Sequence, residues 1–319
     1  MIKIAFFGEA MHELSPNYAV SFGGDTYNSA VYLKRLLDRQ ADVYFVSAIG
    51  CDELSIHAHT LWLHQGLNLQ YLQHSPTRTL GVYGITTDEQ GERAFHYNRK
   101  NSAARVYFDL DQQQMFLIAL KQKQFDYVYF SAISLAILDE AALQLFIAHV
   151  EAYKQAGGRV IFDSNYREIL WQNKAQAQKC YQQAFKIADI IFATNDDHFG
   201  VFGQCSEYQL SAFYQACSHA LVVIKQGIDD TLVLQTVGQN HTLSRYPVSP
   251  VTQVVDTTAA GDSFSAGFLA EYLSGQPIKV AINTAQRLAA QVIGGSGAIV
   301  ATSIMPMSSA VLHAKGLFE

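Results

Sequence analysis

The sequence predicts an α/β fold in which helices cover both faces of a mostly parallel sheet. Two observations lead to this prediction. Short runs of β-branched or aromatic residues alternate along the chain with segments whose apolar residues recur at helical spacing. The apolar runs are also continuous and do not alternate with polar residues, which is typical of strands buried on both faces. Because such sheets bind ligands beyond the carboxyl ends of their strands, we expect functional residues there.

The predicted elements follow in order. The chain begins with a strand at 2–8, a helix at 26–37 and a second strand at 42–50. Four further short apolar runs predict strands, at 126–131, 159–163, 189–193 and 220–225. The helical pattern of 140–158 ends in a Gly-Gly pair, a common helix stop. A further apolar helix is expected to begin close to Asp262.

One region departs from this alternation. Residues 79–99, TLGVYGITTDEQGERAFHYNR, contain two alternating strands around an Asp-Glu-Gln-Gly turn, the pattern of a β-hairpin. The earlier stretch 12–24 is too short for another strand and helix. We expect segments of about 11–24 and 78–106 to form a small antiparallel sheet, inserted as a lid into a single domain of residues 1–319.

Composition excludes several classes of protein. The net charge of −6 and the lack of a basic cluster argue against nucleic acid as a partner. Four cysteines without a Cys-x-x-Cys pair favour neither a zinc site nor a disulfide framework, and they suit a reducing cytoplasm. The apolar run at the start is too short for a signal peptide, and no stretch approaches the length of a membrane helix. We expect a cytoplasmic protein with no membrane partner.

The strongest functional motif is VVDTTAAGDSFSAGF, residues 254–268, which reads as a strand end followed by the start of an apolar helix. A helix N-terminus offers unpaired N–H groups and partial positive charge, and small residues let a phosphate approach them. Asp262 would lie beside this anion and accept the proton of a hydroxyl placed between them. An Asp that only complements the helix dipole is the simpler alternative. Asp256, the paired threonines and the small-residue turn favour the catalytic interpretation.

Other motifs carry less information alone. In FGGDTYNSAVYL, the glycine pair at 23–24 allows close approach of a sugar, with Asp25 and Asn28 as hydrogen-bonding groups, or Asp25 or Thr26 simply caps a helix. An arginine at 99 near two tyrosines could clamp a substrate carboxylate, or pack on a solvated strand face. Further candidates follow two later strands: Asn165, Arg167 and the turn KQGIDD that begins at Lys225. The helix-capping role of Asn165 and a plain tight hairpin after Lys225 are the alternatives. The P-loop, GxGxxG, GxSxG and HExxH motifs are absent from the sequence.

Taken together, these motifs resemble those of the ribokinase-like, pfkB-type carbohydrate kinases. DTTAAGDSFSAGF is similar to their C-terminal signature and FGGDTYNSAVYL to their N-terminal substrate motif, and the likeness extends from Gly8 to about Ile299. Within the family, GEAMHELS, FGGDTYN, GERAFHYNR, SAISLAIL, IFDSNYREILW and DTTAAGD resemble the 2-keto-3-deoxygluconate kinases. The resemblance implies a three-layer α/β/α sandwich and a β-lid that builds a homo-oligomer. It also implies transfer of the ATP γ-phosphate to a sugar 6-hydroxyl with Mg²⁺ and, from relatives, a monovalent cation such as K⁺.

The resemblance also assigns roles to residues. By position, Asp262 resembles the catalytic base, and the backbone of Ala259, Ala260 and Gly261 resembles the anion hole. Contacts to the sugar acid are expected from Gly24, Asp25, Asn28, Tyr83, Tyr97, Arg99, Arg167 and Asp262. Contacts to the nucleotide are expected from Asn165, Asn195, Lys225, Gly227, Asp229 and Gly261.

One position departs from the family pattern. The family often carries Asn-x-x-Glu, whose Glu orders the water shell of Mg²⁺, whereas this chain has Asn195-Asp196-Asp197-His198. Histidine is a poor partner for hydrated Mg²⁺, which prefers oxygen ligands. Either Asp197 or Asp196 replaces the Glu, with Asp197 our assigned candidate, or metal affinity is weaker.

We therefore expect a kinase that phosphorylates 2-keto-3-deoxy-D-gluconate at its 6-hydroxyl. The acid sugar is inferred mainly from the resemblance, supported by the arginines and tyrosines. The first alternative is a kinase of a neutral sugar such as fructose or ribose. The second is a sugar- or nucleotide-binding regulator without catalysis, favoured only by His198.

Overall fold

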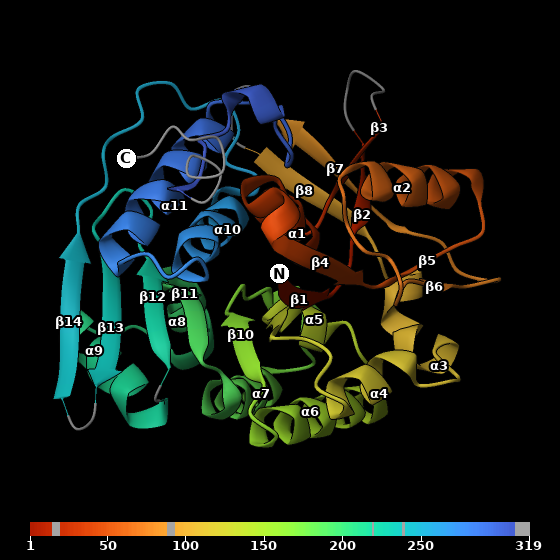
Figure 1. Ribbon diagram of the computed structural model, residues 1–319, viewed down its shortest axis with the longest axis horizontal. Coiled ribbons are helices and arrows are strands. Elements are labelled where there is room, and N and C mark those ends of the chain that lie inside the picture. The colour runs from red at the N-terminus through yellow and green to blue at the C-terminus, as the bar shows by residue number, and fades with distance from the viewer. Residues whose placement is uncertain (15–19, 88–92, 219, 238–239, 310–319) are drawn as a thin grey trace.

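An eight-stranded sheet runs through the middle of the molecule (Figure 1). This computed structural model describes residues 1–14, 20–87, 93–218, 220–237 and 240–309. Six neighbouring strands are parallel, and β13 and β14 continue the sheet antiparallel at one edge. In spatial order the strands are β14 (Asn240–Tyr246), β13 (Thr231–Val237), β12 (Leu221–Lys225), β11 (Ile190–Thr194), β10 (Arg159–Asp163), β9 (Tyr127–Ser131), β1 (Ile2–Phe7) and β4 (Ala41–Val46). The predicted mostly parallel sheet is confirmed.

Helices cover both faces of this sheet, as Figure 1 shows, and each face has its own apolar core. The parallel strands are buried on both sides, which explains why their sequences are continuous apolar runs. The helices that pack on one face are α1 (Asp25–Leu37), α2 (Glu53–His64), α10 (Ala260–Tyr272) and α11 (Ile278–Ile293). Those on the other face include α4 (Met115–Lys121), α5 (Ala132–Ala136), α6 (Glu140–Gln155), α7 (Lys174–Ile187), α8 (Asn195–Phe202) and α9 (Glu207–Cys217). The three-layer α/β/α sandwich is confirmed.

The strand order reverses direction beside β1. The chain moves from β1 to β4 on one side and then returns to β9 on the other side of β1. Such a switch point opens a crevice at the carboxyl ends of the strands. The residues that follow or end β1, β10, β11 and β12 therefore meet at one edge of the sheet, and the candidate site lies there.

A second, four-stranded sheet stands apart from the first (Figure 1). Its order is β3 (Val20–Gly23), β2 (Met11–Leu14), β7 (Gly81–Thr87) and β8 (Arg93–Asn98), with β2 and β7 parallel and the other pairs antiparallel. The expected segments 11–24 and 78–106 contain these strands, although 15–19 and the turn 88–92 lie outside the described residues. The expectation of a purely antiparallel sheet is wrong for the central pair, because β2 and β7 run parallel. That this sheet closes as a lid on a single domain stays a prediction.

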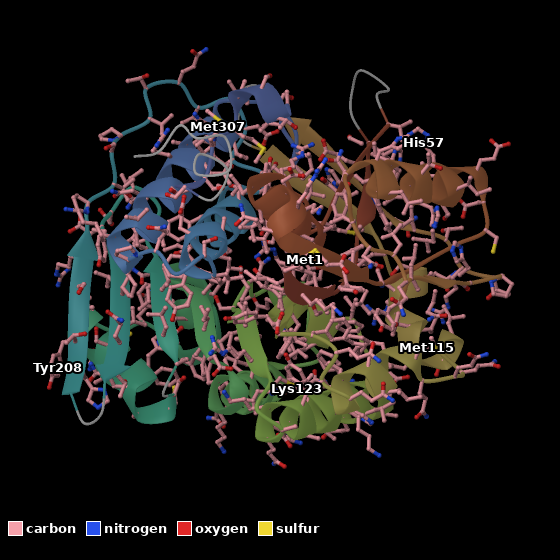
Figure 2. The ribbon with its side chains drawn as sticks, viewed as in Figure 1. Met1, His57, Met115, Lys123, Tyr208 and Met307 are labelled. Atoms are coloured by element: carbon pink, nitrogen blue, oxygen red, sulfur yellow. The ribbon has the colours of Figure 1, made fainter. Side chains whose placement is uncertain are left out.

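The remaining elements are short. Strand β5 pairs with β6, and α2 places His57 beside the small sheet, where its ring lies 6.1 Å from that of Phe22 (Figure 2). Among the helices in the described part of the chain, none is long and apolar enough to span a bilayer. The bounds are β5 (Ala48–Ile49), β6 (Gln73–His74), α3 (Tyr107–Leu110) and the 3₁₀ turns η1 (Asp38–Gln40), η2 (Ala103–Val106), η3 (Glu168–Leu170) and η4 (Thr302–Ile304).

Candidate active site

A cavity of about 550 Å³ lies at the carboxyl ends of the parallel strands, bordered by the small sheet. Its size lies within the range of ligand sites. The large sheet contributes the ends of β10, β11 and β12, and the turn before α10 supplies the opposite part of the wall. Residues expected from the sequence that line it are Gly24, Asp25, Asn28, Tyr83, Tyr97, Arg99, Asn165, Arg167, Asp197, Lys225, Ala259, Ala260, Gly261 and Asp262. The structure thus brings together segments more than two hundred residues apart in sequence.

The turn before α10 is shaped by local hydrogen bonds. Asp256 is buried and accepts from the N–H groups of Thr258 and Gly297, both at 2.9 Å. Ala259 adopts a left-handed backbone with φ of 61°, and the helix begins at Ala260. The N–H groups of a first helical turn have no acceptor further up the helix. An anion in the cavity would meet these donors and the positive end of the helix dipole.

Asp262 lies in this first turn with its carboxylate in the cavity. Burial, followed by the nearby carboxylates of Asp25 and Asp163, raises its pKa, whereas Asn28 and Lys225 lower it, and the net pKa is about 7. The Asn28 amide donates to Asp262 Oδ2 at 2.8 Å and fixes its orientation. A carboxylate with a pKa near neutrality is suited to accept a proton from an alcohol and later release it.

Asp25 lies next to this base. It is the first residue of α1, and Asn165 Nδ2 donates to its Oδ2 at 3.1 Å. Burial raises the pKa of Asp25 as well. The sequence also allowed Asp25 or Thr26 to be the N-cap of α1 and Asn165 to cap a helix, and both of these interpretations are wrong. The N-cap of α1 is Gly24, and Asn165 bonds to Asp25, whereas the N-cap of the following 3₁₀ turn is Arg167.

The glycine pair brings the start of α1 against the strand end of β1. A Cβ on Gly24 would lie 2.2 Å from the Glu9 carbonyl oxygen, so any other residue would push α1 away from that strand. Gly24 lines the cavity, as the predicted close approach of a sugar requires.

The small sheet contributes buried polar pairs. Arg99 forms an ion pair with Glu9, and both side chains are buried. The Tyr83 hydroxyl donates to Glu13. The ring of Tyr97 lies near both pairs: its centroid is 6.0 Å from that of the Tyr83 ring and 5.9 Å from the Arg99 guanidinium carbon. The expected clamp residue therefore already has an internal counter-ion, which the sequence analysis did not foresee.

A second cluster lies under the first turn of α10. Asp163, at the end of β10, accepts hydrogen bonds from the Tyr129 hydroxyl at 2.8 Å and the Ser265 hydroxyl at 3.2 Å. Lys225 Nζ, at the end of β12, lies 3.4 Å from Asp163 Oδ2 and 3.4 Å from the Gly261 carbonyl oxygen. Both charged side chains are nearly inaccessible and both line the cavity.

Three expected nucleotide contacts lie outside the cavity lining, and one expected sugar contact lies at its rim. Gly227, with φ of 64°, and Asp229 lie in the tight turn between β12 and β13, outside the cavity lining. Asn195 also lies outside the lining, and its Oδ1 is buried without a hydrogen-bond partner in the described structure. The Arg167 side chain is exposed at the rim and donates to the Tyr166 carbonyl oxygen at 2.7 Å.

The acidic start of α8 separates into residues with different surroundings. Asp197 is buried, and its carboxylate oxygens accept from Ser164 Oγ at 2.7 Å and from Tyr166 N at 2.8 Å. His198 does not line the cavity. It packs among Phe202, Phe213 and Tyr214, and burial lowers its pKa to about 4, so the ring is neutral at pH 7. Asp196 is exposed and lines the cavity.

Sequence reasoning did not assign a role to Glu9 or Asp163. Glu9 directly follows Gly8 after β1, and Asp163 is the last residue of β10, so both lie at strand ends where ligands bind. A carboxylate at the end of an otherwise apolar strand was the available signal. Its partners could not be found from the sequence, because they are supplied by β9, β12, α10 and Arg99, the residue after β8.

Comparisons with known proteins agree with this arrangement. Residues 2–305 match the pfkB family carbohydrate kinases. The chain is 38% identical over 310 residues to the 2-dehydro-3-deoxygluconokinase of Dickeya dadantii, covering 95% of this chain and 98% of that protein. It is 34% identical to the enzyme of the same name from Haemophilus influenzae, over 94% and 96%. The crystal structure of aminoimidazole riboside kinase from Salmonella enterica, with its riboside and an ATP analogue, has the same fold. It matches with a TM-score of 0.77 at 21% identity, over 99% of this chain and 100% of that one.

Proposed function

The chain belongs to the pfkB family of carbohydrate kinases, and from this premise we propose that it transfers the ATP γ-phosphate to the 6-hydroxyl of 2-keto-3-deoxy-D-gluconate. The single observation that carries the chemistry is Asp262, a half-buried carboxylate that lines the cavity beside a helix N-terminus and has a pKa near 7. The substrate is supported by the names of the relatives that are 34–38% identical.

In the proposed reaction, Asp262 accepts the proton of the sugar hydroxyl as its oxygen attacks the γ-phosphorus. The new O–P bond forms while the bond to the ADP oxygen breaks, and ADP leaves with that electron pair. Asn28 keeps the carboxylate directed at the hydroxyl through its 2.8 Å hydrogen bond. The N–H groups at the start of α10 face the negative charge that spreads over the phosphoryl oxygens.

The kinase family implies ATP and a divalent metal, and we propose Mg²⁺. Kinases hold this ion through few carboxylates, waters and substrate phosphates, so a complete protein cage is not required. Within the described residues no cluster of three or more metal-binding side chains occurs. Asp196 fits best because its exposed carboxylate lines the cavity, whereas both oxygens of Asp197 already accept hydrogen bonds. When bound, the ion would neutralise phosphate charge. A requirement for K⁺ and assembly through the small sheet remain proposals from the family resemblance.

One observation favours the neutral-sugar alternative. Glu9 already balances the charge of Arg99, so this part of the cavity has no unpaired cation for a carboxylate. Arg167 is the remaining arginine on the lining, and it is exposed at the rim. For the sugar acid to bind as proposed, its carboxylate must join or replace Glu9 at Arg99, or contact Arg167.

A substrate panel tests the proposal. ADP formation is measured with 2-keto-3-deoxy-D-gluconate, its galactonate-derived epimer, fructose and ribose, each with saturating ATP and Mg²⁺. We expect kcat/KM for the gluconate-derived acid to exceed that for either neutral sugar by roughly 10²-fold or more, the value of a charge-assisted contact. Preference for fructose or ribose would replace the sugar-acid assignment. ADP release at background with every sugar would favour the non-catalytic binder.

A further inference from the structure

The contacts between Lys225 and its neighbours, among them Asp163, are longer than those of an ion pair that only stabilises a fold. Charge-assisted N–H···O bonds are usually about 2.7–2.9 Å long. The Lys225 ammonium instead makes three longer contacts, at 3.4 Å to Asp163 Oδ2, 3.4 Å to the Gly261 carbonyl and 3.3 Å to Ser265 Oγ. The ammonium is thus held in place without being fully bonded.

Asp163 does not depend on Lys225 for its hydrogen bonds. The Tyr129 hydroxyl already donates to its Oδ2 at 2.8 Å, and the Ser265 hydroxyl shares its proton between this oxygen at 3.2 Å and the Gly261 carbonyl oxygen at 3.0 Å. The Lys225 side chain is 11% exposed and that of Asp163 4%, so little water solvates either charge. A buried ammonium with long contacts and one face on a cavity retains the capacity to bind an incoming anion.

The position of the ammonium indicates which anion. Lys225 Nζ lies directly below the first turn of α10, at ordinary contact distance (3.4 Å) from where a Cβ of Gly261 would be. It therefore lies beside Gly261, a residue of the proposed anion hole. Among the described residues the cavity lining contains two other cations, and neither is similarly placed: Arg99 is paired with Glu9, and Arg167 is at the rim.

We propose that Lys225 binds the transferring phosphoryl group as a catalytic residue and that Asp163 is the positioning residue that holds it there. Asp163 also keeps the ammonium from pairing with Asp262, where it would block the sugar hydroxyl. The inference rests on the proposed phosphoryl transfer and not on the identity of the sugar. The group transfer is the one described above, with Lys225 remaining protonated throughout.

The charged surroundings of Asp262 provide a signed test. The charged groups that act on it are Asp25 of α1, Asp163 of β10 and Lys225 of β12, with Asn28 as a neutral donor. The hydroxyls of Tyr32 on α1 and Tyr129 on β9 also face it, and both have a raised pKa and stay neutral. Lys225 lowers the pKa of Asp262 and Asp163 raises it. The acidic limb of the kcat/KM profile, which reports this group in the free enzyme, should therefore move to higher pH in Lys225→Met and to lower pH in Asp163→Asn. If the acidic limb moved in the same direction in both variants, the proposed geometry would be wrong.

The principal experiment compares ligands that differ only in the phosphoryl group. Affinities for ADP with Mg²⁺, and for ADP with Mg²⁺, aluminium fluoride and the best acceptor of the substrate panel, are measured by calorimetry. For Lys225→Met we expect kcat to fall roughly 10²–10³-fold, as when one preorganised donor is removed. Affinity for the aluminium fluoride complex should fall similarly, while that for ADP stays within about threefold, as expected of transition-state binding. Equal weakening of both ligands would show a structural or general nucleotide role and overturn the proposal.

Matched variants guard against unfolding. Lys225→Arg retains the charge and should recover part of kcat, and Asp163→Asn should lower kcat with ADP affinity retained. Lys154→Met is the control, because Lys154 forms a comparable ion pair with Asp189 away from the cavity and is about one-third exposed. It should leave kcat unchanged. If the keto acid fails as a substrate, the nucleotide comparison still stands with any sugar that turns over.

Discussion

The two sides of the cavity are built differently. The backbone of the phosphate side comes from one contiguous stretch, Asp256 to Asp262, whose shape is set by backbone conformation and local hydrogen bonds. The pair of Lys225 and Asp163 is added to this side from other strands. The sugar side consists of side chains from separate strands, held by pairs such as Arg99 with Glu9 and Tyr83 with Glu13, which are 90 and 70 residues apart. Phosphoryl transfer takes place on the phosphate side, and the substrate is selected on the sugar side, which is built from residues distant in sequence.

This difference has an energetic meaning. Backbone donors at a helix start are fixed when the helix folds, so they require no rearrangement when charge develops. The sugar side contains buried charges that already neutralise each other, so a charged substrate must be accommodated by exchanging partners. We therefore expect changes on the phosphate side to affect kcat and changes on the sugar side to affect KM.

The largest expected effect is that of Asp262→Asn. Asparagine keeps the shape and can still accept the hydrogen bond from Asn28, but it cannot take up a proton. We expect kcat to fall roughly 10²–10⁴-fold, the usual scale for a positioned proton acceptor, with KM for the sugar nearly unchanged. Steady-state kinetics with the preferred sugar measures both. An active Asp262→Asn enzyme would remove this residue from the role of base.

Asp262→Asn should lower kcat but raise the stability of the fold at neutral and alkaline pH. The pKa of Asp262 is raised from 3.8 to about 7 in the folded chain, mainly by burial. The neutral form therefore stabilises the fold fully below about pH 4, and this contribution is lost as pH rises towards 7. Asp262→Asn should match the wild-type melting temperature near pH 4 and exceed it at pH 8, with a free-energy gain on the order of 2–4 kcal/mol. A variant less stable than wild type at pH 8 would contradict the assigned burial.

A smaller effect is expected on the sugar side from Arg99→Ala. Loss of a charge-assisted contact should raise KM for the keto acid by roughly 10–10²-fold, with little change for a neutral sugar. Truncation also leaves Glu9 buried without its ion-pair partner, which destabilises the fold. The double variant Glu9→Gln/Arg99→Ala removes that charge and serves as the control. A parallel rise in KM for acid and neutral sugars would show that Arg99 does not recognise the carboxylate.

The same contrast explains what the sequence could predict. The parallel sheet was predictable because strands buried on both faces leave continuous apolar runs, and Asp262 was found because its motif is contiguous. Glu9 and Asp163 received no role, since their function depends on partners from other elements. His198 was identified as unusual, but its packing among the aromatic side chains of α8 and α9 depends on tertiary structure. Local chemistry is visible in a sequence, and charge compensation across the fold is not.

The smallest expected effect concerns the movement of the sugar side. If the small sheet closes on the substrate, backbone amides of β7 and β8 should exchange hydrogen several-fold more slowly when the sugar acid is bound, since closure excludes water. Peptides covering Leu80–Arg99 are compared by hydrogen-exchange mass spectrometry in the free enzyme, with ADP alone and with the sugar alone. Helix α6 packs on the face of the large sheet that lies away from α1 and α10, and it is the internal control. Its hydrogen exchange should not change. Protection of β7 and β8 by the sugar but not by ADP would assign closure to the specificity side. Unchanged exchange would mean that the small sheet is as preorganised as the turn before α10. The two sides of the cavity would then differ in the residues that build them but not in how much they move.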